Sequence, residues 1–150
     1  MEPSFKRVML PIDFSDHSDR AAQYAAWFAA TSQGTVHLVH VVANPADPLY
    51  EPQEVPNWVM IDHANQKAQQ LLEAAAQRCL PAGCRRELHV LAGDPREKVI
   101  AAAKDIGADL VVISTHGRSG VVHLVMGSVA EYVVRHSECP VFIVHREATA

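Results

Sequence analysis

The chain has 150 residues, a formal net charge of −4 at pH 7 and a hydrophobic content of 49%, which together predict one globular domain over residues 1–150. The acidic balance, without any cluster of Lys and Arg, argues against nucleic-acid binding. Three cysteines without zinc-ligand spacing indicate free thiols in a reducing compartment, and no apolar run approaches the roughly 18 residues of a membrane span. We therefore expect a cytoplasmic protein that binds neither nucleic acid nor membrane.

The first part of the chain predicts a strand, a helix and a second strand. Residues 5–12 are apolar at their centre and form the first strand. A helix capped by Ser15 or Asp16 follows and ends near Gly34, a residue type that commonly follows a helix. Residues 35–42 are long and apolar enough to form a central strand.

The middle of the chain predicts a loop, two helices and a weaker strand. Four prolines interrupt residues 43–57, which indicates a surface loop of a length that is often functional. A long amphipathic helix follows over residues 58–80, and residues 84–92 form a third strand, at an edge of the sheet. The sequence Asp-Pro-Arg-Glu at residues 94–97 is a strong helix start, and that helix ends at Gly107.

A glycine-bearing loop follows the fourth predicted strand. Residues 108–113 are rich in β-branched side chains, as in a strand that is covered on both faces. Gly117 and Gly120 can take positive φ, and without a Cβ they let a ligand approach the backbone amides. Such a loop can form an anion-binding nest, although both glycines also fit ordinary turns.

A helix start follows this loop at Gly127-Ser128. The N–H groups and the dipole at the start of a helix favour phosphate oxygens. Ser128 and Glu131 have the spacing of a capping box, and the alternative is that Ser128 is only an N-cap. No Gly-Lys-Ser/Thr follows the loop glycines, so the segment is not a P-loop.

A final strand over residues 140–145 completes a β-α-β-α-β-α-β-α-β order. This alternation predicts an α/β fold with a parallel sheet, right-handed crossovers and helices on both faces. Local sequence does not give the order of the strands in the sheet.

These residues resemble the universal stress protein family. Its ATP-binding members carry Gly-x-x-Gly, nine residues, then Gly-Ser/Thr; Gly117, Gly127 and Ser128 match, whereas Ser114 replaces the first glycine. Cys-Pro-Val at residues 139–141 also fits the family, and the resemblance extends from Lys6 to Arg146.

The resemblance implies a Rossmann-like, three-layer α/β/α fold with a five-stranded parallel sheet in the order 3-2-1-4-5. The first and fourth strands then lie side by side at a topological switch point, where ligands bind outside the carboxyl ends of strands. The resemblance further implies ATP or a related adenine nucleotide, Mg²⁺ bound with it, a signalling or protective role in the stress response, and a homodimer formed through the last strand, Val141–Val144. An unknown protein partner is also expected, and the sequence does not distinguish ATP from AMP or a cyclic nucleotide.

Several residues are expected to contact the nucleotide. Asp13 ends the first strand and would bind ribose or nucleotide-bound Mg²⁺, unless it only hydrogen-bonds its own turn before Ser15. Arg118 would pair with a terminal phosphate, or remain solvated. Main-chain groups at His40 and Val41 would face adenine. The expected cofactor-binding residues are Pro11, Ile12, Asp13, His40, Val41, Ile113, Ser114, His116, Gly117, Arg118, Gly120, Gly127, Ser128 and Val129.

Two other functions remain open. Ser114 favours a nucleotide-free dimeric interaction module, because its Cβ resists positive φ. The other is a slow ATP hydrolase or an adenylyl- or phosphoryl-transfer enzyme, although no nucleophile beside a base is recognisable and no catalytic residue is expected. Nine histidines invite a metal interpretation, but His116 and His123 match no familiar ligand spacing, so we expect no structural or catalytic metal.

Overall fold

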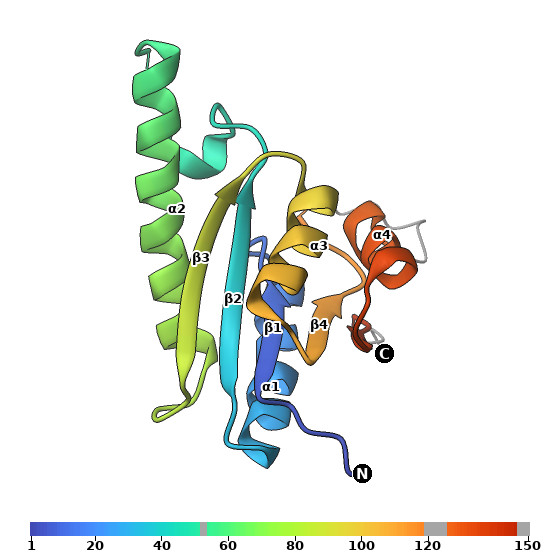
Figure 1. Cartoon of the computed structure of the whole chain (residues 1–150). Helices are drawn as coiled ribbons and strands as arrows, with labels where there is room; N and C mark the ends of the chain where they lie inside the picture. Colours follow the sequence, from blue (N-terminus) through green and yellow to red (C-terminus); the bar gives the residue numbers. More distant parts are fainter. Residues whose placement is uncertain (52–53, 119–125, 147–150) are drawn as a thin grey trace.

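The structure is a computed structural model, and it describes residues 1–51, 54–118 and 126–146. These residues form three layers, a parallel sheet between helices (Figure 1). The sheet order β3-β2-β1-β4-β5 confirms the expected topology. The strands are β1 (Arg7–Pro11), β2 (Thr35–Val42), β3 (Arg86–Ala92), β4 (Leu110–Ser114) and β5 (Val141–Val144); the helices are α1 (Asp16–Thr31), α2 (Asn57–Cys79), α3 (Pro95–Ile106), α4 (Ser128–His136) and a short 3₁₀ helix, η1 (Pro48–Tyr50).

Each face of the sheet carries its own hydrophobic core. Successive side chains of a strand point to opposite faces, so Leu10 of β1 packs in the core beneath α1 and α2, whereas Met9 packs in the core beneath α3 and α4. In the view of Figure 1, α3 and α4 lie in front of the sheet and α1 behind it. The central strands are therefore largely apolar because both of their faces are covered.

The ends of α1 and α3 follow the predicted chemistry with one change. The Ser15 side chain caps α1, the Asp94 side chain caps α3, and Gly107 ends α3 with a φ of 67°. After α1, however, the left-handed residue is Gln33, with a φ of 52°. Gly34 is required for a different reason, because a Cβ there would collide with main-chain oxygens just before β1.

The capping box predicted for α4 is wrong. The N-cap is Gly127, with a φ of −66° and a ψ of 159°, and no side chain caps this helix. Ser128 is instead the first helical residue, and Glu131 pairs with Arg135 one turn later, at 2.9 Å. The main-chain amides in the first turn of α4 therefore have no side-chain cap as a hydrogen-bond acceptor.

The proline-rich segment is more structured than a surface loop. It contains η1, whose last residue, Tyr50, is only 2% exposed. Tyr50 packs in a small core with Val42 of β2 and with Ala64 and Ala68 of α2. This packing brings the proline-rich segment against the carboxyl end of β2.

The three cysteines, Cys79, Cys84 and Cys139, are unpaired in the structure. Among the helices of the described residues, none has the length and apolar character needed to cross a membrane.

Candidate functional site: a cavity at the switch point

A cavity of about 320 Å³ lies at the carboxyl ends of β1 and β4. These two strands pair in parallel at the centre of the sheet, and the chain leaves β1 toward β2 on one side and β4 toward β5 on the other. Ligands of open α/β sheets bind at such switch points, and the volume lies within the range of small-molecule pockets.

All of the predicted site residues that the structure describes line this cavity. Gly120 and His123 lie outside the described residues. The lining residues that the sequence predicted are Pro11, Ile12, Asp13, His40, Val41, Ile113, Ser114, His116, Gly117, Arg118, Gly127, Ser128 and Val129.

Asp13 connects two segments of the cavity wall. Its Oδ1 accepts hydrogen bonds from the Ser15 amide (3.0 Å) and hydroxyl (2.6 Å), so the turn motif considered for this residue is present. Its Oδ2 accepts a hydrogen bond from the Arg118 amide (2.9 Å), in the loop after β4. An ionised carboxylate offers about four lone-pair positions. These three bonds leave one position for a ligand.

Gly117 has a different role from the one predicted for it in an anion nest, and Gly120 lies outside the described residues. Gly117 does not take positive φ, and a Cβ on it would collide with the Asp13 carboxylate. Its lack of a side chain therefore makes room for that carboxylate. Ser114 does not take positive φ either, so the geometry thought to need glycine there is not used. Its hydroxyl donates to the His116 carbonyl at 3.1 Å.

His40 contributes its side chain to the site, which the sequence did not suggest. The ring is 4% exposed, and its two nitrogens lie 2.7 Å from the Ile12 carbonyl oxygen and 2.7 Å from the Tyr50 hydroxyl. Because a carbonyl only accepts, Nδ1 carries the proton, and the Tyr50 hydroxyl donates to Nε2. Burial lowers the pKa of His40 and raises the pKa of Tyr50 to about 12, so both groups are neutral at pH 7.

Phe14 lies beside this histidine in a strained conformation. Its φ is 65°, which is uncommon for a bulky residue, and its ring packs against that of His40 with centroids 4.4 Å apart and an interplanar angle of 37°. Such strain costs of order 1 kcal/mol or more and persists where packing fixes it. The strained residue directly follows Asp13 and helps to set the direction in which the chain leaves β1.

Arg118 pairs with Asp47 across the cavity. The two guanidinium nitrogens lie 3.1 Å from the two carboxylate oxygens, which is a bidentate arrangement. The hydrogen bond from Arg118 holds the pKa of Asp47 below its usual value, and Asp47 also caps η1 through the Leu49 amide. The Arg118 side chain is 42% exposed, so the pair contributes at most about 1 kcal/mol to stability.

Asp47 and Tyr50 line the cavity but are not among the predicted site residues. The sequence carries a signal for Asp47, because Asp47-Pro48 repeats the Asp-Pro pattern at the start of α3.

The start of α4 forms one wall of the cavity. The Gly127 amide donates to the Thr115 carbonyl oxygen and is therefore already used. The amides of the next three residues belong to the first helical turn, where no intrahelical acceptor exists. All three of these residues, Ser128, Val129 and Ala130, line the cavity.

An apolar wall stands on the other side. Val39, Val41, Val99 and Ile113 line the cavity and belong to the core beneath α3 and α4. The cavity thus combines an apolar wall with a polar one, as small-molecule sites usually do.

Comparison with known sequences gives one family. The model of the universal stress protein family matches residues 4–145. Universal stress protein MJ0531 of Methanocaldococcus jannaschii is 28% identical over 146 residues, covering 97% of this chain and 85% of the relative. Universal stress protein G of Shigella flexneri is 30% identical over 142 residues, covering 93% of this chain and 99% of the relative.

Solved structures share the fold of this chain. Protein MJ0577 matches with a TM-score of 0.79 at 24% identity, covering 97% of this chain and 99% of that one. A universal stress protein in complex with cAMP matches with a TM-score of 0.62 at 25% identity (95% and 98% covered), and an Arabidopsis thaliana family protein with AMP bound matches with 0.67 at 24% (95% and 93%). With the family match over nearly the whole length, these findings show that the chain belongs to the universal stress protein family.

Proposed function

We propose that this chain binds an adenine nucleotide, ATP with Mg²⁺ in the first place, in the cavity at the carboxyl ends of β1 and β4, and that it does so as part of a stress response. The observation that carries the proposal is that the described residues among those predicted for nucleotide binding line a single cavity at the switch point. Structural relatives in complex with cAMP and with AMP support adenine nucleotides as the ligand class.

Different groups of the cavity would bind the adenine, the ribose and the phosphates of the nucleotide. Adenine packs against the apolar side chains of Val41 and Ile113. The remaining lone pair of Asp13 accepts a ribose hydroxyl or ligates the nucleotide-bound Mg²⁺. Phosphate oxygens accept hydrogen bonds from the first-turn amides of α4, where the helix dipole is favourable. Because the Gly127 amide is already used, this role falls to residues 128–130 rather than to residues 127–129.

The charges around the cavity explain why a magnesium ion is part of the proposal. Asp13 and Asp47 place two carboxylates at the site against the single guanidinium of Arg118. A polyphosphate therefore binds with its charge partly neutralised by Mg²⁺, or it replaces Asp47 as the ion-pair partner of Arg118. Arg118 keeps the phosphate role that the sequence predicted, in competition with Asp47.

A nucleotide-free interaction module is the second candidate, and one observation favours it. The amide and the guanidinium of Arg118 are both bonded to carboxylates of the chain itself. These two groups of Arg118 thereby have acceptors without any added anion.

We also propose a homodimer formed through β5. This strand is the edge of the sheet and pairs only with β4 among the described residues. A second copy would cover that edge, and the alternative is that the chain's own termini cover it. The three unpaired cysteines fit the cytoplasm as the compartment. Light scattering tests the dimer: the mass should be twice the 16.4 kDa of one chain, and a single-chain mass at high concentration would contradict it.

One experiment separates the two candidate functions. The purified protein is denatured, the released small molecules are identified by mass spectrometry, and the thermal midpoint is followed with Mg-ATP, AMP and cAMP. Co-purified adenine nucleotide, or a midpoint that rises with ligand as mass action requires, supports nucleotide binding. No nucleotide and no shift up to millimolar ligand would leave the interaction module.

A further inference from the structure

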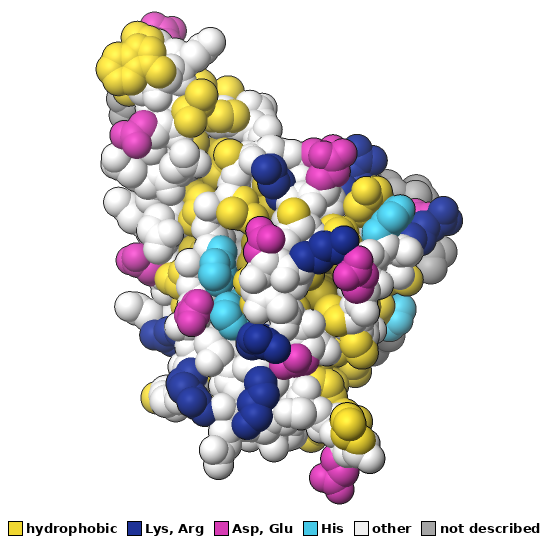
Figure 2. Space-filling view, in the orientation of Figure 1, with side chains coloured by type: hydrophobic (Ala, Val, Ile, Leu, Met, Phe, Trp, Pro, Cys, Tyr) yellow, Lys and Arg dark blue, Asp and Glu magenta, His cyan; other side chains and the backbone are white. Residues whose placement is uncertain are grey.

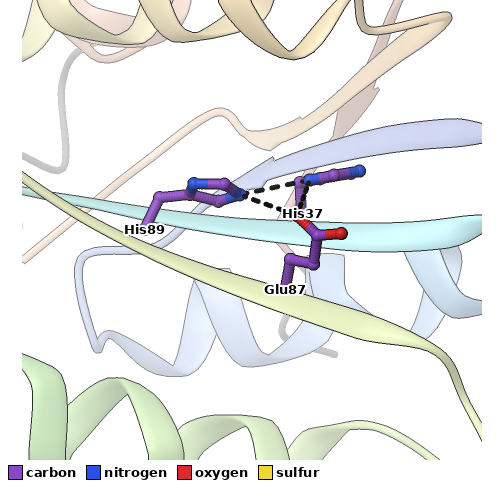
Figure 3. Close-up of side chains that lie close together, drawn as sticks. All are labelled: His37, Glu87 and His89. Atoms are coloured by element: carbon purple, nitrogen blue, oxygen red, sulfur yellow. Dashed lines mark hydrogen bonds and ion pairs between the residues drawn. The ribbon is translucent and has the colours of Figure 1, made fainter.

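A second group of chemically active side chains lies away from the cavity. His37 of β2 and Glu87 and His89 of β3 converge on one another (Figure 3). The parallel register aligns His37 with Glu87 and aligns Val39 with His89. None of the three converging residues lines the nucleotide cavity.

These side chains share the face of the sheet that carries α3 and α4. Val39 and Leu91, each two residues from one of the histidines, pack in the core on that face. Histidine side chains gather beside an acidic one at this surface, next to α3 (Figure 2). The group is thus held by two paired strands rather than by a loop, which keeps its geometry fixed.

The distances suit a single small cation. His37 Nδ1 lies 3.1 Å from His89 Nε2, and the Glu87 Oε2 atom lies 3.6 Å from the first and 3.9 Å from the second. Zinc binds nitrogen and oxygen ligands at about 2.0–2.2 Å, so ligand atoms at the corners of a tetrahedron stand about 3.3–3.6 Å apart. Of the three observed separations, one lies below this range, one at its upper limit and one above it, and small side-chain rotations would bring all three into it.

Burial across the group is graded. The His37 side chain is 8% exposed, that of His89 is 29% exposed, and that of Glu87 is 62% exposed. A buried ligand, a partly buried ligand and an outer carboxylate leave the solvent side open for a fourth ligand. Three protein ligands with an open position are the usual arrangement in zinc sites that exchange a water molecule.

The charges are also compatible with a divalent ion. Two imidazoles are neutral ligands, and the Glu87 carboxylate offsets one of the two positive charges of the metal. Arg7 is near enough to His37 to influence it, but its guanidinium lies 3.6 Å from the Asp109 carboxylate, which offsets its charge. Imidazole and carboxylate together favour a borderline ion such as Zn²⁺ over Mg²⁺ or Ca²⁺.

We propose that His37, Glu87 and His89 form a binding site for a divalent transition-metal ion of the zinc class, with water in the fourth position. The ion bridges β2 to the edge strand β3, and because it binds only the folded chain it stabilises the fold in proportion to its occupancy. This site stands apart from the nucleotide cavity and does not depend on it.

The test uses the full chain, freed of metal with a chelator and then titrated with Zn²⁺ in a calorimeter. We expect one equivalent to bind per chain and the thermal midpoint to rise with Zn²⁺. His89→Ala should weaken binding at least about 100-fold, since even residues behind the ligands cost 10–100-fold when changed. His136→Ala removes an exposed histidine of α4 and should bind as the unchanged protein does.

Two further measurements keep the result interpretable. Glu87→Gln alters an exposed side chain without changing its shape, so it should fold normally and still weaken binding about tenfold. With Co²⁺ in place of Zn²⁺, visible absorption should show a four-coordinate ion that is lost in His89→Ala. No stoichiometric uptake, or uptake that His89→Ala leaves unchanged, would overturn the proposal, the latter because the metal would then be held elsewhere, for example by cysteines.

Discussion

Two helices reach the cavity at the switch point with their first residues, and they begin in different ways. α3 starts with Pro95, which has no amide hydrogen, and the next amide, that of Arg96, donates to the Asp94 side chain at 2.9 Å. α4 starts after Gly127 and has no side-chain cap, although Ser128 and Val129 line the same cavity. The first free amide of α3 thus has an acceptor within the chain. The first-turn amides of α4 have no side-chain acceptor and face the cavity.

The loop after β4 resembles the start of α3, because one of its amides also donates to a carboxylate of the chain. Its Arg118 amide is bonded to Asp13, much as the Arg96 amide is bonded to Asp94. Among the amides described around the cavity, those in the first turn of α4 therefore remain the best placed for an external anion. A missing cap usually costs about 1 kcal/mol, and a bound phosphate would supply the missing acceptors.

The largest expected effect comes from placing a negative charge at the start of α4. Ser128→Asp should weaken Mg-ATP binding about 100-fold or more, because two like charges a few ångströms apart repel by several kcal/mol at a protein surface. The same change should leave the helix slightly more stable, since an acidic residue suits its first turn. Ser128→Asn is the matched control of equal shape, and equal calorimetric affinities of the two variants would contradict the assignment.

The second largest effect is expected from a substitution that fills the space at Gly117. Gly117→Ala places a Cβ against the Asp13 carboxylate, so we expect a loss of about 1–3 kcal/mol in urea unfolding. In an Asp13→Ala background the same change should cost much less, because the colliding atoms are gone. An equal cost in both backgrounds would show that the loop needs this glycine for another reason.

Removing the cap of α3 should affect stability alone. Asp94→Ala should lower the free energy of unfolding by about 1 kcal/mol, the usual value of a lost N-cap. Nucleotide affinity should stay within about twofold, because the α3 amide that Asp94 holds is not expected to meet the ligand. A loss of affinity as large as that in Ser128→Asp would remove the distinction between the two helices.

The smallest effect should follow from freeing Arg118. Asp47→Asn keeps an acceptor that can cap η1 but breaks the ion pair, whose energy is at most about 1 kcal/mol. Mg-ATP should then bind roughly threefold more tightly, and less so at high salt, where exposed charges are screened. Weaker ATP binding, or none of this gain at low salt, would show that Arg118 does not meet the phosphates.

Local sequence predicted the fold class well because each element carries its own signal. The apolar strands, the Asp94-Pro95 start and the Gly107 end all depend on neighbouring residues alone. The strand order came only from the family resemblance, because pairing between strands leaves no mark in a single segment. The capping box failed since the backbone at Gly127, not at Ser128, takes the cap conformation.

The residues that were missed depend on contacts between distant segments. His37 and His89 are 52 positions apart, so a search for metal ligands by spacing along the chain could not pair them. The parallel register of β2 and β3 brings them together. The role of the His40 side chain depends on a similar contact, since its partner Tyr50 lies in the segment for which the sequence predicts only a surface loop.

The central claim is that the first-turn amides of α4 hold the nucleotide phosphates, and one substitution addresses it directly. Ser128→Pro deletes an amide hydrogen at a helix position that accepts proline, and Gly127 already has the extended backbone that precedes proline. Asp16→Pro makes the same change at the first residue of α1, outside the cavity. In calorimetric titrations with Mg-ATP, Ser128→Pro should weaken binding about tenfold or more, as expected for one hydrogen bond to a charged group, and Asp16→Pro should bind like the unchanged chain. Equal affinities in the two variants, or no binding by the unchanged chain, would contradict the account.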